Sequence, residues 1–283
     1  MKNLRKIKSG LIKDKIISLL TKASINIDPI VKNKIKSAIQ TESNPRAKDI
    51  LKTLLKNYRL AKDYKMPICQ DTGSMIIFLE VGQKVTFDGN LNQAIADGIT
   101  TATKKLYLRK SIVKDPLFQR TNTRNNTPPI IHYNIAPGNK VKITVAPKGG
   151  GAENMSRIAM LKPTVGKKGL IDFVLKTVKE AGGNPCPPII VGIGIGGNFE
   201  TAALLAKKSL LTELDQNNED REYAKLEKEI LEKINSTGIG PQGLGGDTTA
   251  LKVNILQKPC HIASLPVAVN LQCHAHRHAS IVI

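Results

Sequence analysis

The sequence predicts a mixed α/β (α+β) protein, with N-terminal helices followed by largely antiparallel sheets flanked by helices. Two observations lead to this fold class. Apolar residues recur at helical spacing through residues 12–65. Beyond residue 66, short apolar runs bounded by glycine and proline, typical of strands, are interleaved with helical segments. This order favours hairpins packed beside helices over a doubly wound parallel sheet.

The composition is that of a soluble globular protein, which we expect in the cytoplasm. Hydrophobic residues make up 41% of the 283 residues, and no apolar run reaches the roughly 18 residues that a membrane span requires. Lys13, Asp14 and Lys15 interrupt the apolar residues near the basic N-terminus, which excludes a secretory hydrophobic region there. We expect residues 1–283 to form one functional chain, with a helical part at 1–65 and a second, α/β part at 66–283.

The net charge of +20 leaves two classes of partner open. A basic surface attracts nucleic acid, and a non-enzymatic nucleic-acid-binding protein is the alternative from another class. Aromatic residues are only 4% of the chain, tryptophan is absent, and the lysines are scattered, so platforms for stacking bases are scarce. We therefore expect small anionic substrates or an acidic partner protein, and no nucleic acid.

The helical part contains two recognisable helix starts. Asp28-Pro29 and Asn44-Pro45 each resemble an N-cap followed by proline at the first helical position. Apolar residues then follow at spacings of three and four. These helices are predicted to be structural, and we assign them no chemistry.

The next elements are expected to be a buried strand at Met75–Val81 and a helix that begins at Asn90. Arg109 comes near the C-terminal end of that helix. It is either a solvated cation favoured by the helix dipole or a clamp for a carboxylate, for which the guanidinium group is suited. Ile130–Ala136 and Lys140–Pro147 are predicted to form a hairpin.

Three consecutive glycines, residues 149–151, follow that hairpin and are expected to open a helix. Their backbone can approach a ligand closely, so an anion site there is reasonable, although the spacing is not that of a P-loop. The remaining elements follow in order: helices at 167–182, 198–211 and 217–234, a glycine-rich loop at 238–247, and strands at 189–195, 249–256 and 262–271.

The segment Met66–Gly73 places a thiol, an amide, a carboxylate and a hydroxyl on four consecutive residues, which begin at Cys69. The flanking proline and glycine predict a turn, and a turn can direct consecutive side chains to one point. Cys186 lies between prolines, and Cys273 follows the last predicted strand. Three such thiolates can hold a [4Fe-4S] cluster and leave one iron without a protein ligand.

Two other interpretations of the cysteines remain open. All four could be ordinary buried cysteines, because none are spaced as C-x2-C. A zinc site is the other interpretation. It would draw on the following residues: Cys260, His261, His274, His276 and His278.

The chain resembles the iron–sulfur hydro-lyase family, which contains class I fumarate hydratases and L(+)-tartrate dehydratases. The motifs that carry the resemblance are Ile-Cys-Gln-Asp-Thr-Gly, Gly-Gly-Gly-Ala-Glu-Asn, Asn-Pro-Cys-Pro-Pro, Gly-Ile-Gly-Ile-Gly-Gly, Gly-Pro-Gln-Gly-Leu-Gly-Gly and Leu-Pro-Val-Ala-Val-Asn-Leu-Gln-Cys. They occur in family order between about residues 66 and 278, so the resemblance covers nearly the whole chain. It implies reversible hydration of fumarate to L-malate, a step of the tricarboxylic acid cycle, or alternatively dehydration of L(+)-tartrate.

The resemblance also implies roles for individual residues. Cys69, Cys186 and Cys273 match the ligands of a [4Fe-4S] cluster whose open iron acts as a Lewis acid. The other matches are the substrate contacts Gln70, Arg109 and Gly150, and the proposed catalytic acid pair Asp71 and His261. Cys260 matches no ligand position.

A partner is implied as well. Single-chain members of the family continue into a second domain that carries the base, whereas this sequence stops at Ile283. The resemblance therefore implies that this chain is the α subunit of a two-subunit enzyme and that a separate β subunit completes it. The expected assembly is a homodimer or an α2β2 hetero-oligomer.

Overall fold

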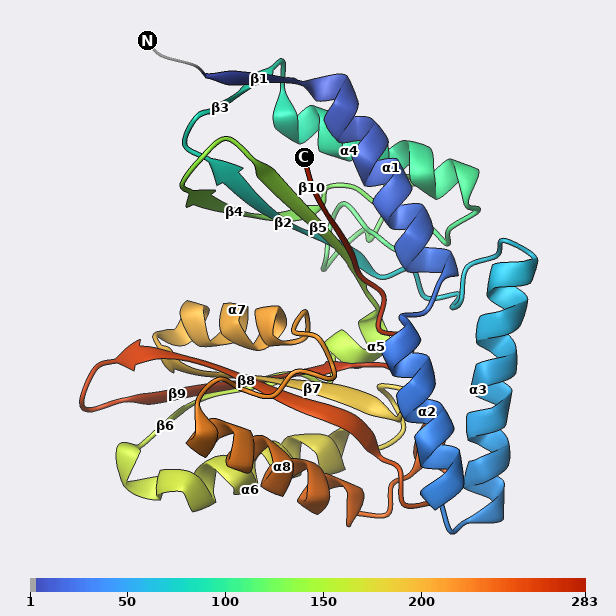
Figure 1. Cartoon of the computed structure of the whole chain (residues 1–283), viewed down its shortest axis with the longest axis vertical. Helices are drawn as coiled ribbons and strands as arrows, with labels where there is room; N and C mark the ends of the chain where they lie inside the picture. The colour runs from blue at the N-terminus through green and yellow to red at the C-terminus, as the bar shows by residue number, and fades with distance from the viewer. Residues whose placement is uncertain (1–3) are drawn as a thin grey trace. The chain divides into compact units, whose positions relative to one another are not determined.

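The computed structural model describes residues 4–283 and confirms a mixed α/β fold with largely antiparallel sheets (Figure 1). The chain divides into two compact units that alternate along the sequence. Unit 1 comprises the described part of Met1–Ile27 together with Asn57–Gly150 and Arg277–Ile283. Unit 2 comprises Asp28–Lys56 and Gly151–His276. No helix within residues 4–283 is long and apolar enough to cross a membrane.

Unit 1 is built on a four-stranded sheet in the order β10-β5-β2-β4. Strands β10 and β2 each pair antiparallel with β5, whereas β4 pairs parallel with β2. Helices α1 and α4 pack against each other, and α1 also contacts β5 and β10 (Figure 1). The bounds are α1 Ser9–Ile25, β2 Ser74–Gly82, α4 Leu91–Lys105, β4 Ile130–Ala136, β5 Val141–Lys148 and β10 Ala279–Val282, with β1 Arg5–Lys8 and β3 Val85–Asp88 forming a small parallel pair.

Unit 2 contains a second four-stranded sheet in the order β6-β9-β7-β8. Helix α7 covers one face, and α6 and α8 cover the other (Figure 1). The bounds are α2 Pro29–Thr41, β6 Arg157–Leu161, α6 Gly166–Ala181, β7 Ile189–Gly197, α7 Phe199–Ser209, α8 Arg221–Asn235, β8 Ala250–Cys260 and β9 Leu265–Gln272. Two further helices contain residues of both units: α3 Pro45–Asp63 and the single turn α5 Gly150–Glu153.

The glycines of β7 serve the packing of α7. A Cβ atom on Gly194 would stand 2.1 Å from the carbonyl oxygen of Ala202, so only glycine lets the helix approach this closely. The glycines of this strand therefore have a structural explanation in the packing of the helix.

The predicted helix starts are confirmed. The carboxylate of Asp28 accepts a hydrogen bond from the Ile30 amide at 2.7 Å, and the side chain of Asn90 accepts one from the Gln93 amide at 3.0 Å. The side-chain oxygen of Asn44 accepts from the Arg46 amide at 3.0 Å. These caps supply acceptors for backbone N–H groups that have no partner within the helix.

Three local predictions are wrong. Residues 130–136 and 140–147 do not form a hairpin, because β2 lies between them and pairs with both. The helix that begins after Asn90 ends at Lys105, so Arg109 lies in the following loop. The glycines at 149–151 lead into a single helical turn, and an extended strand, β6, follows instead of a longer helix. The sequence did not predict β1 or β10.

Candidate functional site

In unit 1, the Cys69 segment is a turn that lies between α3 and β2, as predicted. Its backbone is anchored by hydrogen bonds from the Ile68 amide to the Ser24 carbonyl at 2.8 Å and from the side chain of Asn57 to the Ile68 carbonyl at 2.9 Å. The Asp71 amide donates to Sγ of Cys69 at 3.4 Å. An amide donor of this kind stabilises a thiolate, which is the form that binds metal.

Three strand ends of unit 1 meet at this turn. The turn immediately precedes β2, Gly149 immediately follows β5, and Arg277 precedes β10. Because β5 is antiparallel to both β2 and β10, with Ser74 opposite Lys148, these three ends lie at the same edge of the sheet.

The side chains at this edge are close together. A Cβ atom on Gly149 would stand 2.9 Å from Oδ2 of Asp71 and 3.4 Å from Nη2 of Arg277. A Cβ atom on Gly150 would stand 3.9 Å from the same Asp71 oxygen. The carboxylate of Asp71 therefore lies over two successive glycines, which leave space for it.

Arg277 is the residue at this edge that our sequence reasoning missed. It is only 3% exposed, and its Nε and Nη2 atoms have no hydrogen-bond partner among the described residues. These two atoms form one edge of the guanidinium, the edge that grips a carboxylate with two parallel bonds. A buried cation is costly unless negative charge lies near it, and the Asp71 carboxylate lies against the same glycine. The sequence shows only a His-Arg-His run at this point, which does not reveal that the arginine is buried.

Arg109 lies in the loop that leads from α4 toward β4. The loop is pinned by Asn126, which is fully buried. The side chain of Asn126 donates to the Arg109 carbonyl at 3.0 Å and accepts from the Ser111 amide at 2.7 Å. The backbone around Arg109 is thus fixed to Asn126, which lies four residues before the start of β4, and β4 starts at the same end of the sheet as β2.

In unit 2, the structure brings Cys186 and Cys273 to the same edge of the second sheet. Cys186 precedes β7 and Cys273 follows β9, and these strands are antiparallel, with Ile190 opposite Gln272. The His274 amide donates to the Cys186 carbonyl at 3.4 Å, so the two cysteine turns are in direct contact. Cys186 adopts a positive φ of 56°, which is uncommon for a residue with a side chain.

The glycine-rich loop at 238–247 supports the Cys186 turn. The backbone amide and the side-chain amide of Gln242 both donate to the Pro187 carbonyl, each at 2.8 Å. At the other end of the loop, the buried Glu42 carboxylate accepts from the amides of Asp247 and Thr248.

Asp247 anchors this loop to the start of α3. Its carboxylate accepts from the Ser43 amide at 2.8 Å. Hydrogen bonds from the Ser43 side chain first, and then from its backbone, lower the pKa of Asp247 below the ordinary value. Asp247 is therefore a structural residue of the loop.

His261 lies at the opposite end of the second sheet from Cys186 and Cys273. It stands between β8 and β9, where Gly197, the last residue of β7, is opposite Cys260. The eight residues of β9 separate the two ends, a span of about 25 Å. Unit 2 therefore does not bring His261 to its own pair of cysteines. The same separation keeps Cys260 and His261 away from His274 and His276, which counts against the zinc site.

The donor set fits an iron–sulfur cluster in its chemistry. None of Cys69, Cys186 and Cys273 is in a disulfide bond; Cys186 is exposed and the other two are partly exposed. Each lies in a turn at a strand end and not within the apolar core. Reactive or ligating thiols are typically found in such partly exposed places. Within residues 4–283, no three His, Cys, Asp or Glu side chains form a group ready to hold a single metal ion.

Comparison with known proteins gives consistent matches. The family model for fumarate hydratase (Fumerase) matches residues 13–282. A protein of Methanocaldococcus jannaschii, provisionally named L(+)-tartrate dehydratase subunit alpha, is 44% identical over 274 residues, which cover 95% of this chain and 96% of that protein. The L(+)-tartrate dehydratase subunit alpha of Escherichia coli K12 is 34% identical over 257 residues, covering 89% and 84% of the two chains.

The chain therefore belongs to the fumarate hydratase family and is a hydro-lyase component. Within that family it is an alpha subunit of the class I fumarate hydratase and tartrate dehydratase type, since it aligns along nearly the full length of proteins that carry this name.

Proposed function

We propose that this chain is the α subunit of a [4Fe-4S] hydro-lyase that interconverts a 2-hydroxy dicarboxylate and its dehydrated product. Fumarate hydration to L-malate is the first candidate reaction. L(+)-tartrate dehydration is the second, and it is favoured by the names of the relatives. We expect the enzyme to be cytoplasmic, because thiols stay reduced in the cytoplasm.

The observation that carries the proposal is that each unit presents thiols or charged side chains at one edge of its sheet. Cys186 and Cys273 share one sheet edge in unit 2. Cys69 shares an edge in unit 1 with Asp71 and the buried cation Arg277. Thiols for a cluster, together with a carboxylate held beside a buried cation, suit an iron–sulfur enzyme that acts on a dicarboxylate.

The three thiols, Cys69, Cys186 and Cys273, would hold the cluster. When bound, a [4Fe-4S] group with one open iron supplies Lewis-acid chemistry for the departure of a hydroxyl group. The amide of Asp71, which donates to Cys69, would stabilise the thiolate form of that ligand.

The remaining residues of unit 1 would bind and orient the substrate. Arg109 would pair with one carboxylate through its guanidinium, while the backbone of Gly150 and the amide side chain of Gln70 would hold the substrate in place. Asp71 would take part in proton transfer at the hydroxyl group. Because a proton acceptor for the C3 position is absent from these assignments, we assign that base to a separate β subunit.

Arg277 would be a positioning residue for Asp71. Its guanidinium lies against the same glycine as the Asp71 carboxylate, and buried charge acts strongly over such short separations. The cation would hold the carboxylate in one orientation above Gly149 and Gly150, ready for the substrate.

His261 would act as the proton-transfer partner of Asp71 only from a second copy of this chain. Its place at the far end of β9, about 25 Å from Cys273, supports this arrangement. An assembly with at least two α subunits, a homodimer or an α2β2 complex, would then be required for activity.

The test is to purify the chain anaerobically with its β subunit and reconstitute it with iron and sulfide. Turnover of L-malate and L(+)-tartrate is then compared at equal enzyme concentration. The proposal expects clear turnover of one substrate and dependence on the β subunit. Cluster assembly without turnover of either acid would reject the reaction, and turnover by the chain without a β subunit would reject the partner.

A further inference from the structure

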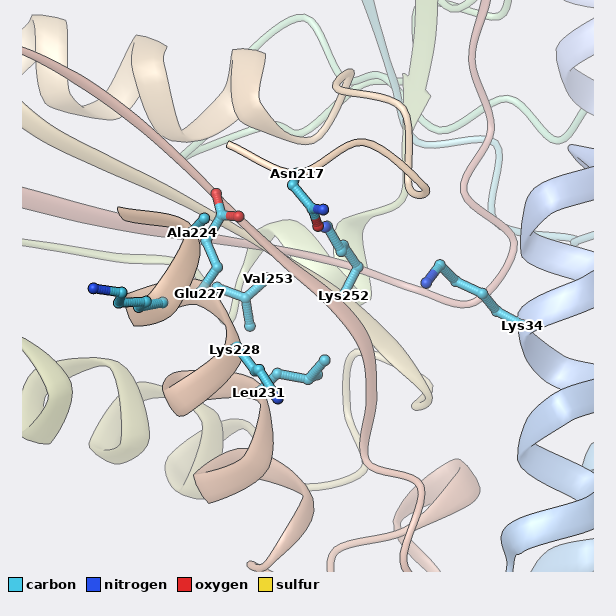
Figure 2. A pocket seen from close by; sticks show the side chains of 9 residues that line it. Lys34, Asn217, Ala224, Glu227, Lys228, Leu231, Lys252 and Val253 are labelled. Carbon is cyan, nitrogen blue, oxygen red and sulfur yellow. The ribbon is translucent and has the colours of Figure 1, made fainter. Parts of the chain in front are cut away.

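A pocket of about 400 Å³ lies in unit 2, between α2, α8 and β8, and carries an excess of positive charge (Figure 2). This volume is within the range of small-molecule sites, roughly 300–1,000 Å³. Four lysines line the pocket: Lys34, Lys225, Lys228 and Lys252. Neither the proposed active site nor the packing of the core requires them.

Lys225 and Lys228 have partners on their own helix. Lys225 pairs with Glu222 at 2.7 Å, and Lys228 lies 4.0 Å from Glu232. Both pairs are exposed, and they join residues three or four positions apart, which are neighbours on a helix surface. They account for the two lysines without a ligand.

Lys34 and Lys252 differ from the other two. Figure 2 shows Lys34 extending from α2 with its ammonium directed toward Lys252 and Asn217. The described residues provide no hydrogen-bond or ion-pair partner for the ammonium of Lys34. Burial lowers the pKa of Lys34, and the charge of Lys252 lowers it further, whereas the charge of Asp215 raises it.

The second lysine retains free donors. The ammonium of Lys252 donates to the Gln216 carbonyl at 2.7 Å, and an ammonium has three N–H groups. The nearby carboxylate of Glu227 does not neutralise the pair through a direct contact. Its oxygen accepts from the Ile255 amide at 2.7 Å and from the Asn218 side chain at 3.1 Å.

The charge of Lys252 acts on the Lys34 ammonium in this partly buried pocket, and an anion bound near both lysines would relieve that repulsion. We propose that this pocket binds a small molecule through a dianionic group, either a phosphate or a pair of carboxylates, bridged by Lys34 and Lys252. A dianion suits two lysines better than a chloride, because each ammonium can donate to separate oxygens. The proposal does not depend on the hydro-lyase reaction.

The test uses the full-length chain and isothermal titration calorimetry at constant ionic strength. The probes are inorganic phosphate, adenosine 5′-monophosphate and succinate. Lys34→Gln and Lys252→Gln are each expected to weaken binding by roughly tenfold, the value of one charged hydrogen bond. Lys34→Arg should retain most of the affinity because it retains the charge.

Lys32→Gln is the matched control, since Lys32 is an exposed lysine on the same helix. It should bind as the unmodified chain does. Preference for phosphate and the nucleotide, or for succinate, identifies the source of the dianionic group. Binding by none of the probes at millimolar concentration overturns the proposal. Equal losses for Lys34→Gln and Lys32→Gln overturn it as well, because they indicate only a general effect of charge.

Discussion

The dipeptide Cys-His occurs at both ends of strand β9, and the two ends are built differently. Cys260-His261 precedes the strand and Cys273-His274 follows it. At the first end, the side-chain hydrogen bonds of the dipeptide are local: Sγ of Cys260 lies 3.3 Å from the Ser264 carbonyl, and Nδ1 of His261 accepts from the Ala263 amide. At the second end, the His274 amide contacts the Cys186 turn, which Gln242 in turn supports.

This difference teaches that residue type alone does not identify a site. Both ends offer a thiol beside an imidazole, yet only at the second end does the Cys-His turn contact another cysteine turn, that of Cys186. Fixing distant segments costs conformational entropy, so a protein retains such anchoring where geometry matters. We therefore assign the cluster ligand to Cys273 and leave Cys260 as an ordinary exposed cysteine.

The largest expected effect separates the two thiols of this comparison. Cys273→Ser should reduce the activity of the reconstituted αβ enzyme by at least about 100-fold, because even outer-sphere partners of a metal contribute 10- to 100-fold. Cys260→Ser should retain the activity. The measurement is the initial rate together with the iron content per chain. Equal behaviour of the two variants would remove the distinction between the two ends.

The next effect concerns His261. His261→Ala should lower the rate by about 100-fold or more, the contribution of a general acid or base. When His261→Ala and Cys69→Ser chains are mixed and reassembled, activity should return to roughly a quarter of normal, because one site of a hybrid two-fold dimer is intact. No recovery in verified hybrids would mean that His261 does not act from a second copy.

A smaller effect is expected at the unit 1 edge. Arg277→Met should lower kcat by about 10- to 100-fold through misplacement of Asp71, with little change in KM. The same variant should keep or raise the melting temperature, since it removes a buried cation that has no partner at two of its nitrogens. Enzyme kinetics and thermal unfolding measure both.

Arg59→Met, an exposed arginine on α3, is the matched control and should change neither quantity. Gly149→Ala is the second variant, because its Cβ would press on the Asp71 carboxylate at 2.9 Å. It should reproduce the loss in kcat. A large loss of stability in Arg277→Met with unchanged kcat would show a purely structural arginine.

The smallest effect is a pH dependence at the loop that supports Cys186. The pKa of Asp247 is lowered in the folded chain, so its contribution to stability is complete above the ordinary carboxyl pKa of about 4. The contribution is lost as the pH falls through the lowered folded value. Asp247→Asn should therefore flatten the fall in stability below about pH 4, as followed by urea unfolding. An unchanged slope would contradict this role.

The sequence predicted the fold best where local signals decide the structure. The caps at Asp28, Asn44 and Asn90 act within a few residues, and the apolar period of the helices is strong, so these elements were predicted correctly. The hairpin at 130–147 failed because strand pairing is not local. A Pro-Gly-Asn turn reverses the chain, but it does not exclude a third strand, β2, from lying between the two arms.

The candidate site was predictable to a different extent in each part. Proline, glycine and polar residues around Cys69 and Cys186 predicted turns, and both cysteines lie in turns. The position of Arg277 depends on β10 pairing with β5 across more than a hundred residues, so no local pattern could assign it. The separation of His261 from Cys273 likewise follows from the strand between them, which motif order alone does not convey.

The most direct test of the central claim is elemental analysis of the α chain purified anaerobically with its β subunit. A cluster held by Cys69, Cys186 and Cys273 predicts about four irons and four sulfides per α chain after reconstitution. Replacing any one of these cysteines with serine should remove most of that iron, and Cys260→Ser should not. Zinc in place of iron, or full iron content in the Cys69→Ser, Cys186→Ser or Cys273→Ser variant, would contradict the assignment.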